Sequence, residues 1–505
     1  MIDYLKERPM LVSAVGCIVS AFCGFYCKVA LMVCFALFTG LFLLVVIKKN
    51  YPLAVAFLLT LVMTVSCFLT LNRINELNKY SDSVITADIC VLGTTFKSDS
   101  YFITEAEVIK CDSFPKNTKL ILFHSPLSLR GGDALRTKIK ILKLLDKYKA
   151  SSYGKNIFLS GEVLELKRQD SADGVLSATE KLKDYIRACL FGNMKYESAA
   201  TMSALIFGDR SYLTDEFYDN VKASGVAHAM VVSGMHLTII VGLVLKIIEK
   251  FIYNYRLKAL IMFMVVLLLC TVCGFTMSIL RAGVTYILIA VALLLKRPYS
   301  GENALGGAVT FISIASPFAI FSIAFQLSLL STFGILAVAM PIYKRLKKKI
   351  TNKIFCYFAQ LVTISLSATI MVLPVMIYVF GYVSVVSVLT NLLIDFPLSY
   401  CLCGGVIAVI IKPVFPFTAS ILLDATDLGI RYINGAINFI GGQKFATVRV
   451  DEKGVYISVA LIFVIFKIML ICKSRQDMLK LKLMNEKILS ERGSKTKWQS
   501  FLRSP

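Results

Sequence analysis

Side chains that could do chemistry gather between residues 204 and 237, in a stretch that is otherwise mostly apolar. Two of the three histidines of the chain, His228 and His236, stand there eight residues apart, a spacing that predicts one face of a helix. Ser233 precedes His236, and a serine beside a histidine could act as a nucleophile with its base. No nucleophile-elbow motif surrounds this serine, and no carboxylate stands beside the histidines to complete a metal site. We therefore expect the two imidazoles to hydrogen-bond neighbouring helices.

The same mostly apolar stretch contains glycines and charged residues, and their presence there requires a structural or functional explanation. Asp209 and Arg210 precede the histidines, and we interpret them as a helix cap or an ion pair. Gly225 and Gly234 predict places where a backbone approaches another closely or where a helix breaks.

Isolated polar residues recur farther along the chain, within runs of apolar residues. Arg281 could be an anchor that extends to the membrane surface or a contact for phosphate, whose geometry suits the guanidinium. Gln326, Ser328 and Asn391 are uncharged, and such groups either join helices or line a pore. The sequence leaves both alternatives open.

The elements that must hold these residues are membrane spans, since the chain is 57% hydrophobic and only 17% charged. Residues 227–472 are expected to form the main membrane domain, after three N-terminal spans within residues 1–78. The expected spans are residues 10–26, 29–47, 53–71, 227–248, 257–273, 279–295, 303–316, 318–340, 354–380, 383–411 and 454–472. Residues 415–450 are less apolar and are expected to be interfacial or re-entrant, so the span count after residue 354 stays open.

The net charge of +23 follows mainly from lysines and arginines that flank the spans. Because such residues favour the cytoplasmic side, we expect a retained cytoplasmic N-terminus and a basic cytoplasmic tail at residues 473–505. The protein is thus expected to cross the cytoplasmic membrane several times.

Residues 79–176 are polar and alternate over short stretches between glycines and prolines. That pattern predicts a small β-barrel outside the membrane, and five strands would suit an OB-fold. Residues 177–226 follow as amphipathic helices that lie on the membrane surface or pack on the barrel. The predicted fold class is a polytopic α-helical membrane protein with one extracytoplasmic, OB-fold-like barrel.

Basic residues dominate part of this barrel segment. Eight of them stand against two acidic residues, Asp133 and Asp146, a local excess of six positive charges. With aromatic residues interleaved, the segment resembles a surface for single-stranded nucleic acid, although a solvated face or contact with anionic lipid would look the same. The basic residues are Arg130, Arg136, Lys138, Lys140, Lys143, Lys147, Lys149 and Lys155.

Most of the 14 cysteines lie in apolar runs, where a thiol acts as a small hydrophobic group. Cys90 and Cys111 lie in the barrel segment and could form a disulfide. No zinc-binding pattern is present, and we expect neither a metal nor a cofactor.

Five ordered motifs together resemble the ComEC family of competence proteins. Residues 224–236 read SGVAHAMVVSGMH, close to the family's pattern SG-x-x-H-L-L-A-V-S-G-L-H. The other matches are Gly208-Asp209-Arg210, SILRA at 278–282, FQLSL at 325–329, and Leu373-Pro374 through Phe380-Gly381 and Ser384 to Asn391-Leu392-Leu393.

The resemblance implies a channel that carries one strand of DNA inward during natural transformation, with the barrel receiving DNA outside. His228 and His236 would then be candidates for DNA contact in the pore, beside the interhelical role. The expected partners are single-stranded DNA, a DNA receptor, a separate nuclease and an ATP-driven motor, since no Walker motif occurs. Assembly of several copies stays open.

Longer family members carry a metallo-β-lactamase-like domain, which needs a histidine cluster that three histidines cannot supply. We therefore expect that this chain is not an enzyme. The rival function is a transporter of a small or lipid-linked solute with the same fold, and an intramembrane enzyme is the weaker third alternative.

Overall fold

The computed structural model describes residues 8–92, 96–97, 102–111, 113–124, 129, 131–168, 175–230, 232–451 and 453–467. Two compact units divide the chain: the larger comprises Met1–Thr369 and Ser384–Val448, and the smaller Ile370–Val383 and Arg449–Pro505. Most of the described chain is helical, and eight helices are long and apolar enough to cross a membrane. The protein is therefore a multi-pass membrane protein, as the composition predicts.

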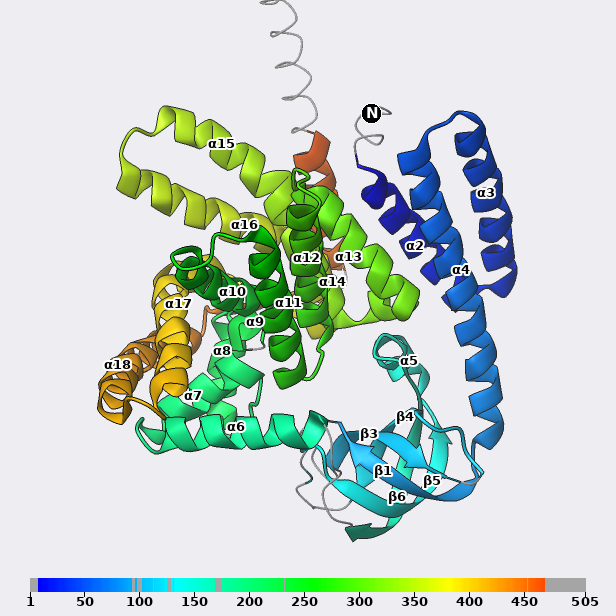
Figure 1. Cartoon of the computed structure of the whole chain (residues 1–505), viewed down its shortest axis with the longest axis horizontal. Helices are drawn as coiled ribbons and strands as arrows, with labels where there is room; N and C mark the ends of the chain where they lie inside the picture. Colours follow the sequence, from blue (N-terminus) through cyan, green and yellow to red (C-terminus); the bar gives the residue numbers. More distant parts are fainter. Residues whose placement is uncertain are drawn as a thin grey trace, which may run out of the picture. The chain divides into compact units, whose positions relative to one another are not determined.

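Three N-terminal helices, α2 (Pro9–Tyr26), α3 (Lys28–Ile47) and α4 (Tyr51–Leu77), stand side by side (Figure 1). Small polar residues join α2 to α4: the Ser20 and Thr64 hydroxyls lie 3.1 Å apart. Their opposite faces expose valine, leucine and phenylalanine, which suits contact with lipid chains. The three predicted spans at residues 10–26, 29–47 and 53–71 are confirmed.

A closed five-stranded barrel follows α4 and the short 3-10 helix η1 (Asn78–Tyr80). The barrel order is β1, β5, β6, β4, β3 and back to β1, and β4 and β6 run parallel. Inward residues alternate with outward ones on β5, where Leu135, Thr137, Ile139 and Ile141 are buried. The small barrel that the sequence predicts is confirmed, and its closure removes free sheet edges. The strands are β1 (Val84–Val91), β2 (Phe96–Lys97), β3 (Phe102–Lys110), β4 (Lys119–His124), β5 (Ala134–Lys143) and β6 (Ile157–Arg168).

A short helix, α5 (Asp146–Tyr153), interrupts the connection between β5 and β6. It places Tyr153 against Phe25 of α2 and Phe318, with ring centroids 6.0 and 5.8 Å apart. The barrel and the N-terminal helices therefore share one apolar cluster with residues 318–321.

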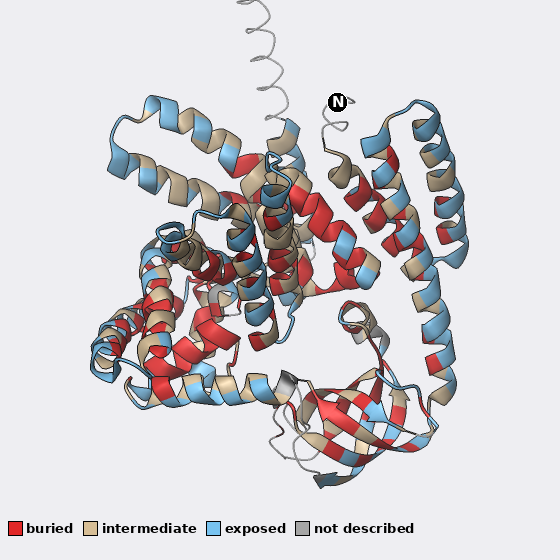
Figure 2. Ribbon diagram, in the orientation of Figure 1, coloured by how far each residue is buried: buried red, intermediate tan, exposed pale blue. Residues whose placement is uncertain are grey.

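Three helices lead from the barrel into the rest of the larger unit: α6 (Val175–Phe191), α7 (Tyr196–Phe207) and α8 (Asp215–Ala223). One face of α6 packs with α7 through Leu182 and Ile186, while Tyr185 stays partly exposed. This amphipathic helix thus packs on the helical bundle. Figure 2 shows α7 almost entirely buried.

The remaining helices form the bundle, with α11 and α12 adjacent and α17 and α18 adjacent (Figure 1). They are α9 (Ala227–Met230), α10 (Gly234–Glu249), α11 (Tyr255–Val272), α12 (Met277–Leu294), α13 (Gly301–Ala315), η2 (Ala319–Phe321), α14 (Ile323–Gly334), η3 (Ile335–Ala339), α15 (Met340–Lys349), α16 (Lys353–Phe380), α17 (Ser387–Ile411) and α18 (Pro416–Gly441). Two short strands are β7 (Tyr382–Ser384) and β8 (Thr447–Arg449).

Several predicted spans are wrong in detail. The span at residues 227–248 is two helices, because the chain breaks between α9 and α10. The span at 303–316 is a buried 15-residue helix, too short to cross a bilayer core. The span at 318–340 is shifted to Ile323–Lys349, which contains the π-helical turn η3.

Residues 415–450 contain a continuous helix of 26 residues, α18, which is not among the eight candidate spans. The predicted interfacial or re-entrant position of this segment stays a prediction. The buried Asp427 of this helix pairs with Arg431 at 2.6 Å, and the pair offsets part of the free energy that burying the carboxylate costs. In the smaller unit the described residues 453–467 are helical, and Val450 N–H donates to the Gly381 carbonyl at 3.0 Å.

Candidate functional site

The start of α10 is organised by two residues of the histidine motif. Ser233 caps the helix, and its hydroxyl accepts from the Met235 amide at 3.3 Å. The His236 ring reaches back, and its Nδ1 accepts from the Ser233 amide at 3.0 Å. The two residues therefore form a capping box.

This arrangement argues against a serine hydrolase. The Nδ1 lone pair of His236 is already used by a backbone amide, so it is not available to take a proton from Ser233. Neutral His236 then carries its hydrogen on Nε2, which is buried and lacks a hydrogen-bond partner in the described part of the chain.

His228 lies on α9 and is exposed, whereas His236 lies on α10 and is 1% exposed. The prediction that both share one face of a single helix is wrong, because the break before Ser233 separates them. The glycine and serine that follow the break begin a new helix, so the helical periodicity does not continue across it.

Arg281 of α12 is buried next to this helix start. Its Nε donates to the Ser328 hydroxyl of α14 at 2.7 Å, and the Ser278 and Ser328 hydroxyls lie 3.1 Å apart. A Cβ at Gly234 would stand 2.7 Å from Nη2 of Arg281, so a side chain added at this position would displace the end of the guanidinium. Three motifs distant in sequence thus meet at Gly234, Arg281 and Ser328.

The charge of Arg281 has no carboxylate within 4 Å in the part of the chain that the structure describes. Only 7% of the residue is exposed. The interpretation of Arg281 as an anchor extending to the membrane surface is therefore wrong. A buried cation without a counter-ion in a membrane bundle is costly, and such residues usually mark a pathway.

Gly225 and Asn391 mark other close contacts of the bundle. Gly225 has a φ of +79°, and a Cβ there would stand 2.4 Å from Cβ of Ser387 at the start of α17. Asn391 donates to the Ser365 hydroxyl of α16 at 2.9 Å, which supports the helix-joining alternative for this residue. Neither residue has a contact with Arg281.

Gln326 has a structural role. Its amide donates to the Ile320 carbonyl at 2.9 Å and so fixes η2 to the start of α14. The barrel docks at the same place, because Ser316 donates to the Asn156 side chain at 2.8 Å and Gly154 lies against the Ser322 backbone. The barrel connection therefore touches the helix that carries Ser328.

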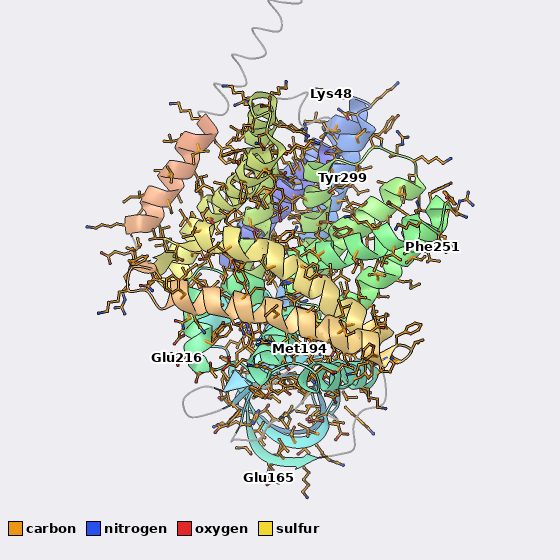
Figure 3. All side chains as sticks on the ribbon, turned by 90° about the vertical axis from the view of Figure 1, so that its left-hand side faces the viewer. Lys48, Glu165, Met194, Glu216, Phe251 and Tyr299 are labelled. Carbon is orange, nitrogen blue, oxygen red and sulfur yellow. The ribbon has the colours of Figure 1, made fainter. Side chains whose placement is uncertain are left out.

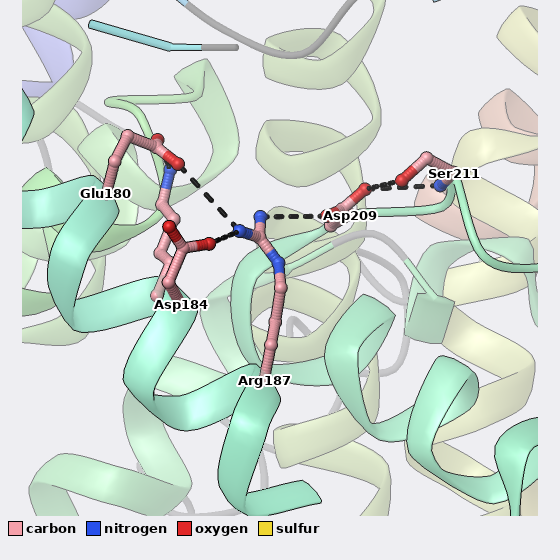
Figure 4. Close-up of polar contacts among 6 residues, drawn as sticks. Glu180, Asp184, Arg187, Asp209 and Ser211 are labelled. Carbon is pink, nitrogen blue, oxygen red and sulfur yellow. Dashed lines mark hydrogen bonds and ion pairs between the residues drawn. The ribbon is translucent and has the colours of Figure 1, made fainter. Parts of the chain in front are cut away.

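Asp209 and Arg210 do not pair with each other. Asp209 is 5% exposed and accepts from Arg187 of α6 at 3.0 Å and from the Ser211 hydroxyl at 2.6 Å (Figure 4). Arg210 instead contacts Tyr218, with its guanidinium 5.1 Å from the ring centroid. The predicted ion pair between Asp209 and Arg210 is therefore wrong, and the cation that pairs with Asp209 is Arg187.

Arg187 also approaches Asp184 at 2.7 Å and Glu180 at 4.0 Å. Burial alone would lower the pKa of Arg187, but the Asp209 carboxylate foremost, and the Asp184 carboxylate after it, raise that pKa above its ordinary value. The cluster fixes α6, which leaves the barrel, to the turn after α7.

The basic face predicted on the barrel is partly neutralised by carboxylates of neighbouring strands. Arg136 and Lys138 lie on the outside of β5, where Asp88 and Glu165 approach them at 3.8 and 3.9 Å. Lys155 pairs with Glu105 at 2.6 Å. The local count of charge missed these carboxylates because they come from β1, β3 and β6.

Lys140 and Lys143 are exposed and form no ion pair within the described residues. Arg130 and the side chain of Lys147 lie outside the described residues. Lys140 and Lys143 therefore remain the candidates for a nucleic-acid contact on β5.

The predicted disulfide is absent, since both Cys90 and Cys111 are free thiols. Cys90 pairs in register with Glu107, whereas the Cys111 sulfur lies 3.4 Å from the Thr86 carbonyl, four residues earlier on β1. That offset along a strand is too long for a disulfide.

Sequence reasoning missed Asp395 of α17, a carboxylate inside a candidate span for which no ion pair is found among the described residues. Its signal was an acidic residue in the apolar run 383–411. It also missed Arg187 as the partner of Asp209, which only tertiary structure reveals.

Lys48 and Tyr299 lie toward one end of the larger unit, and Glu165 of the barrel lies at the other end (Figure 3). The larger unit therefore has the barrel at one end and Lys48 near the opposite end.

ComE operon protein 3 of Bacillus subtilis (strain 168) is 24% identical to the chain over 255 residues. The alignment covers 50% of this chain and 32% of that relative, so the chain spans about a third of the relative's length. No solved structure matches the chain. Residues 205–475, more than half of the sequence, match the family described as Competence protein. The chain therefore belongs to the competence protein family.

Proposed function

We propose that the protein is a channel that passes one strand of DNA across the cytoplasmic membrane during natural transformation. Family membership supports a role in DNA uptake. The observation that carries the channel is the buried guanidinium of Arg281, which lacks a counter-ion among the described residues and lies where three motifs meet. A passing phosphodiester would supply the missing negative charge.

The proposed orientation follows from charge. Lysines and arginines prefer the cytoplasmic ends of spans, and the end that carries Lys48 is opposite the barrel. The barrel would then lie outside and receive DNA, while the basic residues of α15 face the cytoplasm. The exposed Lys140 and Lys143 would contribute contacts to the DNA backbone there.

The chain would not itself be an enzyme. Degradation of the other strand and the driving force would come from a separate nuclease and an ATP-driven motor, and a receptor would deliver the DNA. Such a division suits a conduit, whose residues bind the strand weakly and do not break its bonds.

A transporter of a lipid-linked solute is the alternative, and one observation favours it. A groove of about 510 Å³ between α17 and α18 is lined by Leu389, Leu393, Tyr432, Phe439 and neighbouring apolar residues. An acyl chain would fit such a surface.

The test is internalisation of fluorescently labelled DNA, measured as nuclease-protected signal, in a competent strain that lacks the gene. The channel proposal expects binding at the cell surface without internalisation, and recovery when the intact gene returns. Normal internalisation without the gene would reject the channel and favour the lipid-linked alternative. Controls that carry an empty vector separate loss of the gene from loss of competence.

A further inference from the structure

We propose that Arg281, together with the N-terminus of α10, forms a binding site for a single phosphodiester anion of a nucleic-acid strand. The inference rests on the proposed function and deepens it, because it assigns the ligand chemistry to one place in the bundle. The proposal assigns a binding role to this site and no chemical reaction to its residues.

Two positive groups face each other at this place. The first turn of α10 carries the positive end of the helix dipole, and it contains no acidic residue. Arg281 points its Nη2 at this turn, 2.7 Å from the position of a Cβ on Gly234. The Ser233 cap and the Ser328 hydroxyl are neutral acceptors, so the mutual repulsion of the two positive groups is not cancelled by a negative charge unless an anion lies nearby.

The surrounding helices supply hydroxyls and no carboxylate. The first turns of α12 and α14 contain no acidic residue either, and Ser278 and Ser328 provide the polar contacts. A fixed carboxylate would satisfy Arg281 permanently and would repel phosphate. Hydroxyls orient the guanidinium without neutralising it.

The hydrogen bonds of Arg281 leave a free edge for a ligand. Among the described residues Ser328 is the sole hydrogen-bond partner of the guanidinium, and its hydroxyl accepts from Nε. The two terminal nitrogens therefore remain, and their planar fork matches the two non-ester oxygens of a phosphodiester. The residue is more than nine-tenths buried, so water screens the contact weakly.

A single phosphate contact also fits transport. It carries no sequence information, since it reads the backbone alone. One charge holds a moving strand less firmly than a row of charges would, because each phosphate contact adds to the affinity. We therefore expect the strand to exchange one phosphate for the next at this site.

The test measures binding of a fluorescent, abasic deoxyribose-phosphate oligomer to the purified full chain in dodecyl maltoside. Fluorescence anisotropy is recorded over a range of KCl concentrations for the wild type, R281Q and R281K. We expect R281Q to weaken binding about tenfold, the usual effect of losing one charge-assisted hydrogen-bonded contact. The slope of log affinity against log salt should fall by about 0.7, the value for one phosphate on a single strand.

R281K retains the charge, so its salt slope should equal that of the wild type while its affinity falls. The matched control is R256Q, at an exposed arginine at the start of α11, which should leave both quantities unchanged. An uncharged methylphosphonate oligomer should bind wild type and R281Q alike. Thermal melting of each variant verifies folding, and R281K keeps the test informative if R281Q does not fold.

The outcomes separate the site from the proposed function. Unchanged affinity and slope in R281Q would overturn the site while leaving the DNA channel intact. Failure of the wild type to bind any charged oligomer would overturn both. Phosphatidylglycerol micelles test the other source of phosphodiester: loss of lipid binding in R281Q, with oligomer binding unchanged, would reject a nucleic-acid ligand.

Discussion

Gly234 of α10 and Arg281 of α12 lie 47 positions apart in the sequence and are in contact, and the guanidinium occupies space beside the glycine that a larger side chain would enter. A Cβ at Gly234 would stand 2.7 Å from Nη2 of Arg281 and 3.2 Å from Cβ of Ala282. The glycine of the histidine motif and the arginine of the SILRA motif therefore form one structural unit. Changes at the glycine should act through the arginine.

Substitution G234A should displace the guanidinium of Arg281 and lower DNA internalisation at least tenfold. The cost in stability should be about 1–3 kcal/mol, as for an overpacked interior. Thermal melting in detergent and internalisation of labelled DNA measure the two effects.

The control is G242A in the same helix, where no atom lies within 4 Å of the added carbon. Alanine there should be neutral or slightly stabilising, by up to about 1 kcal/mol, since it favours helix. Equal internalisation in both variants would show that the contact with Arg281 has no role.

Substitution D209N should unfold the protein more readily, because it leaves the buried Arg187 without its main carboxylate. The loss should cost about 1.5–3 kcal/mol, as for a hydrogen bond to a charged group, since Asp184 still pairs with Arg187. The matched control is D219N, whose exposed pair with Lys222 should be worth about 0–1 kcal/mol. Equal melting temperatures for the two variants would contradict the structural role of Asp209.

The positions of the spans were largely predictable, whereas the site was not. Apolar runs long enough to cross a bilayer identified α2, α3, α4, α11, α12 and α16, since length and composition decide membrane insertion. The break before Ser233 was not predictable from periodicity, because the residues on both sides are apolar and the signal at the break is a short Ser-Gly pair.

Contacts between residues that are distant in the sequence explain the other wrong predictions. The excess of basic residues on β5 is reduced, but not removed, once Asp88 and Glu165 take their places on adjacent strands. The meeting of Gly234, Arg281 and Ser328 depends on packing between α10, α12 and α14, which no local pattern encodes.

Replacement of Lys140 and Lys143 together by alanine should reduce the salt slope of oligonucleotide binding by about 1.4, for two lost phosphate contacts. Replacement of Arg136 and Lys138 should have a smaller effect, since carboxylates already oppose their charges. Anisotropy titrations of the full chain compare the pairs. A larger effect for Arg136 and Lys138 would contradict the neutralisation of this face.

Cys90 should react with iodoacetamide far more slowly than Cys111 in the folded protein. Burial, with smaller contributions from Glu107 and Asp133, raises the pKa of Cys90 above its ordinary value, so the reactive thiolate is scarce. Because the folded state favours the neutral thiol, Cys90 contributes fully to the stability of the fold when the pH is below the ordinary pKa of a thiol. This contribution is lost as the pH rises through the raised pKa of the folded state.

Mass spectrometry of labelled peptides at pH 8, with and without denaturant, measures the two rates. Both cysteines should be recovered as thiols from protein purified without a reducing agent. Recovery of a peptide in which Cys90 is joined to Cys111 would contradict the offset seen along β1.

Substitution G154A should separate the barrel from the start of α14, because the new Cβ would stand 2.6 Å from the Ser322 backbone nitrogen. Oligonucleotide binding by the barrel should persist while DNA internalisation falls. Substitution G40A on α3, with open space around it, is the control. Loss of oligonucleotide binding in G154A would show that the docking contact supports the barrel itself.

The most direct measurement of the conduit is photo-crosslinking in competent cells during uptake. A benzophenone amino acid replaces Leu327, next to Ser328 on α14, or Phe263, which lies on the exposed face of α11. The account predicts that internalising DNA forms an adduct at position 327 and not at position 263, and that the adduct is lost in an R281Q background. Adducts at neither position, in cells that internalise DNA normally, would contradict passage of the strand beside Arg281.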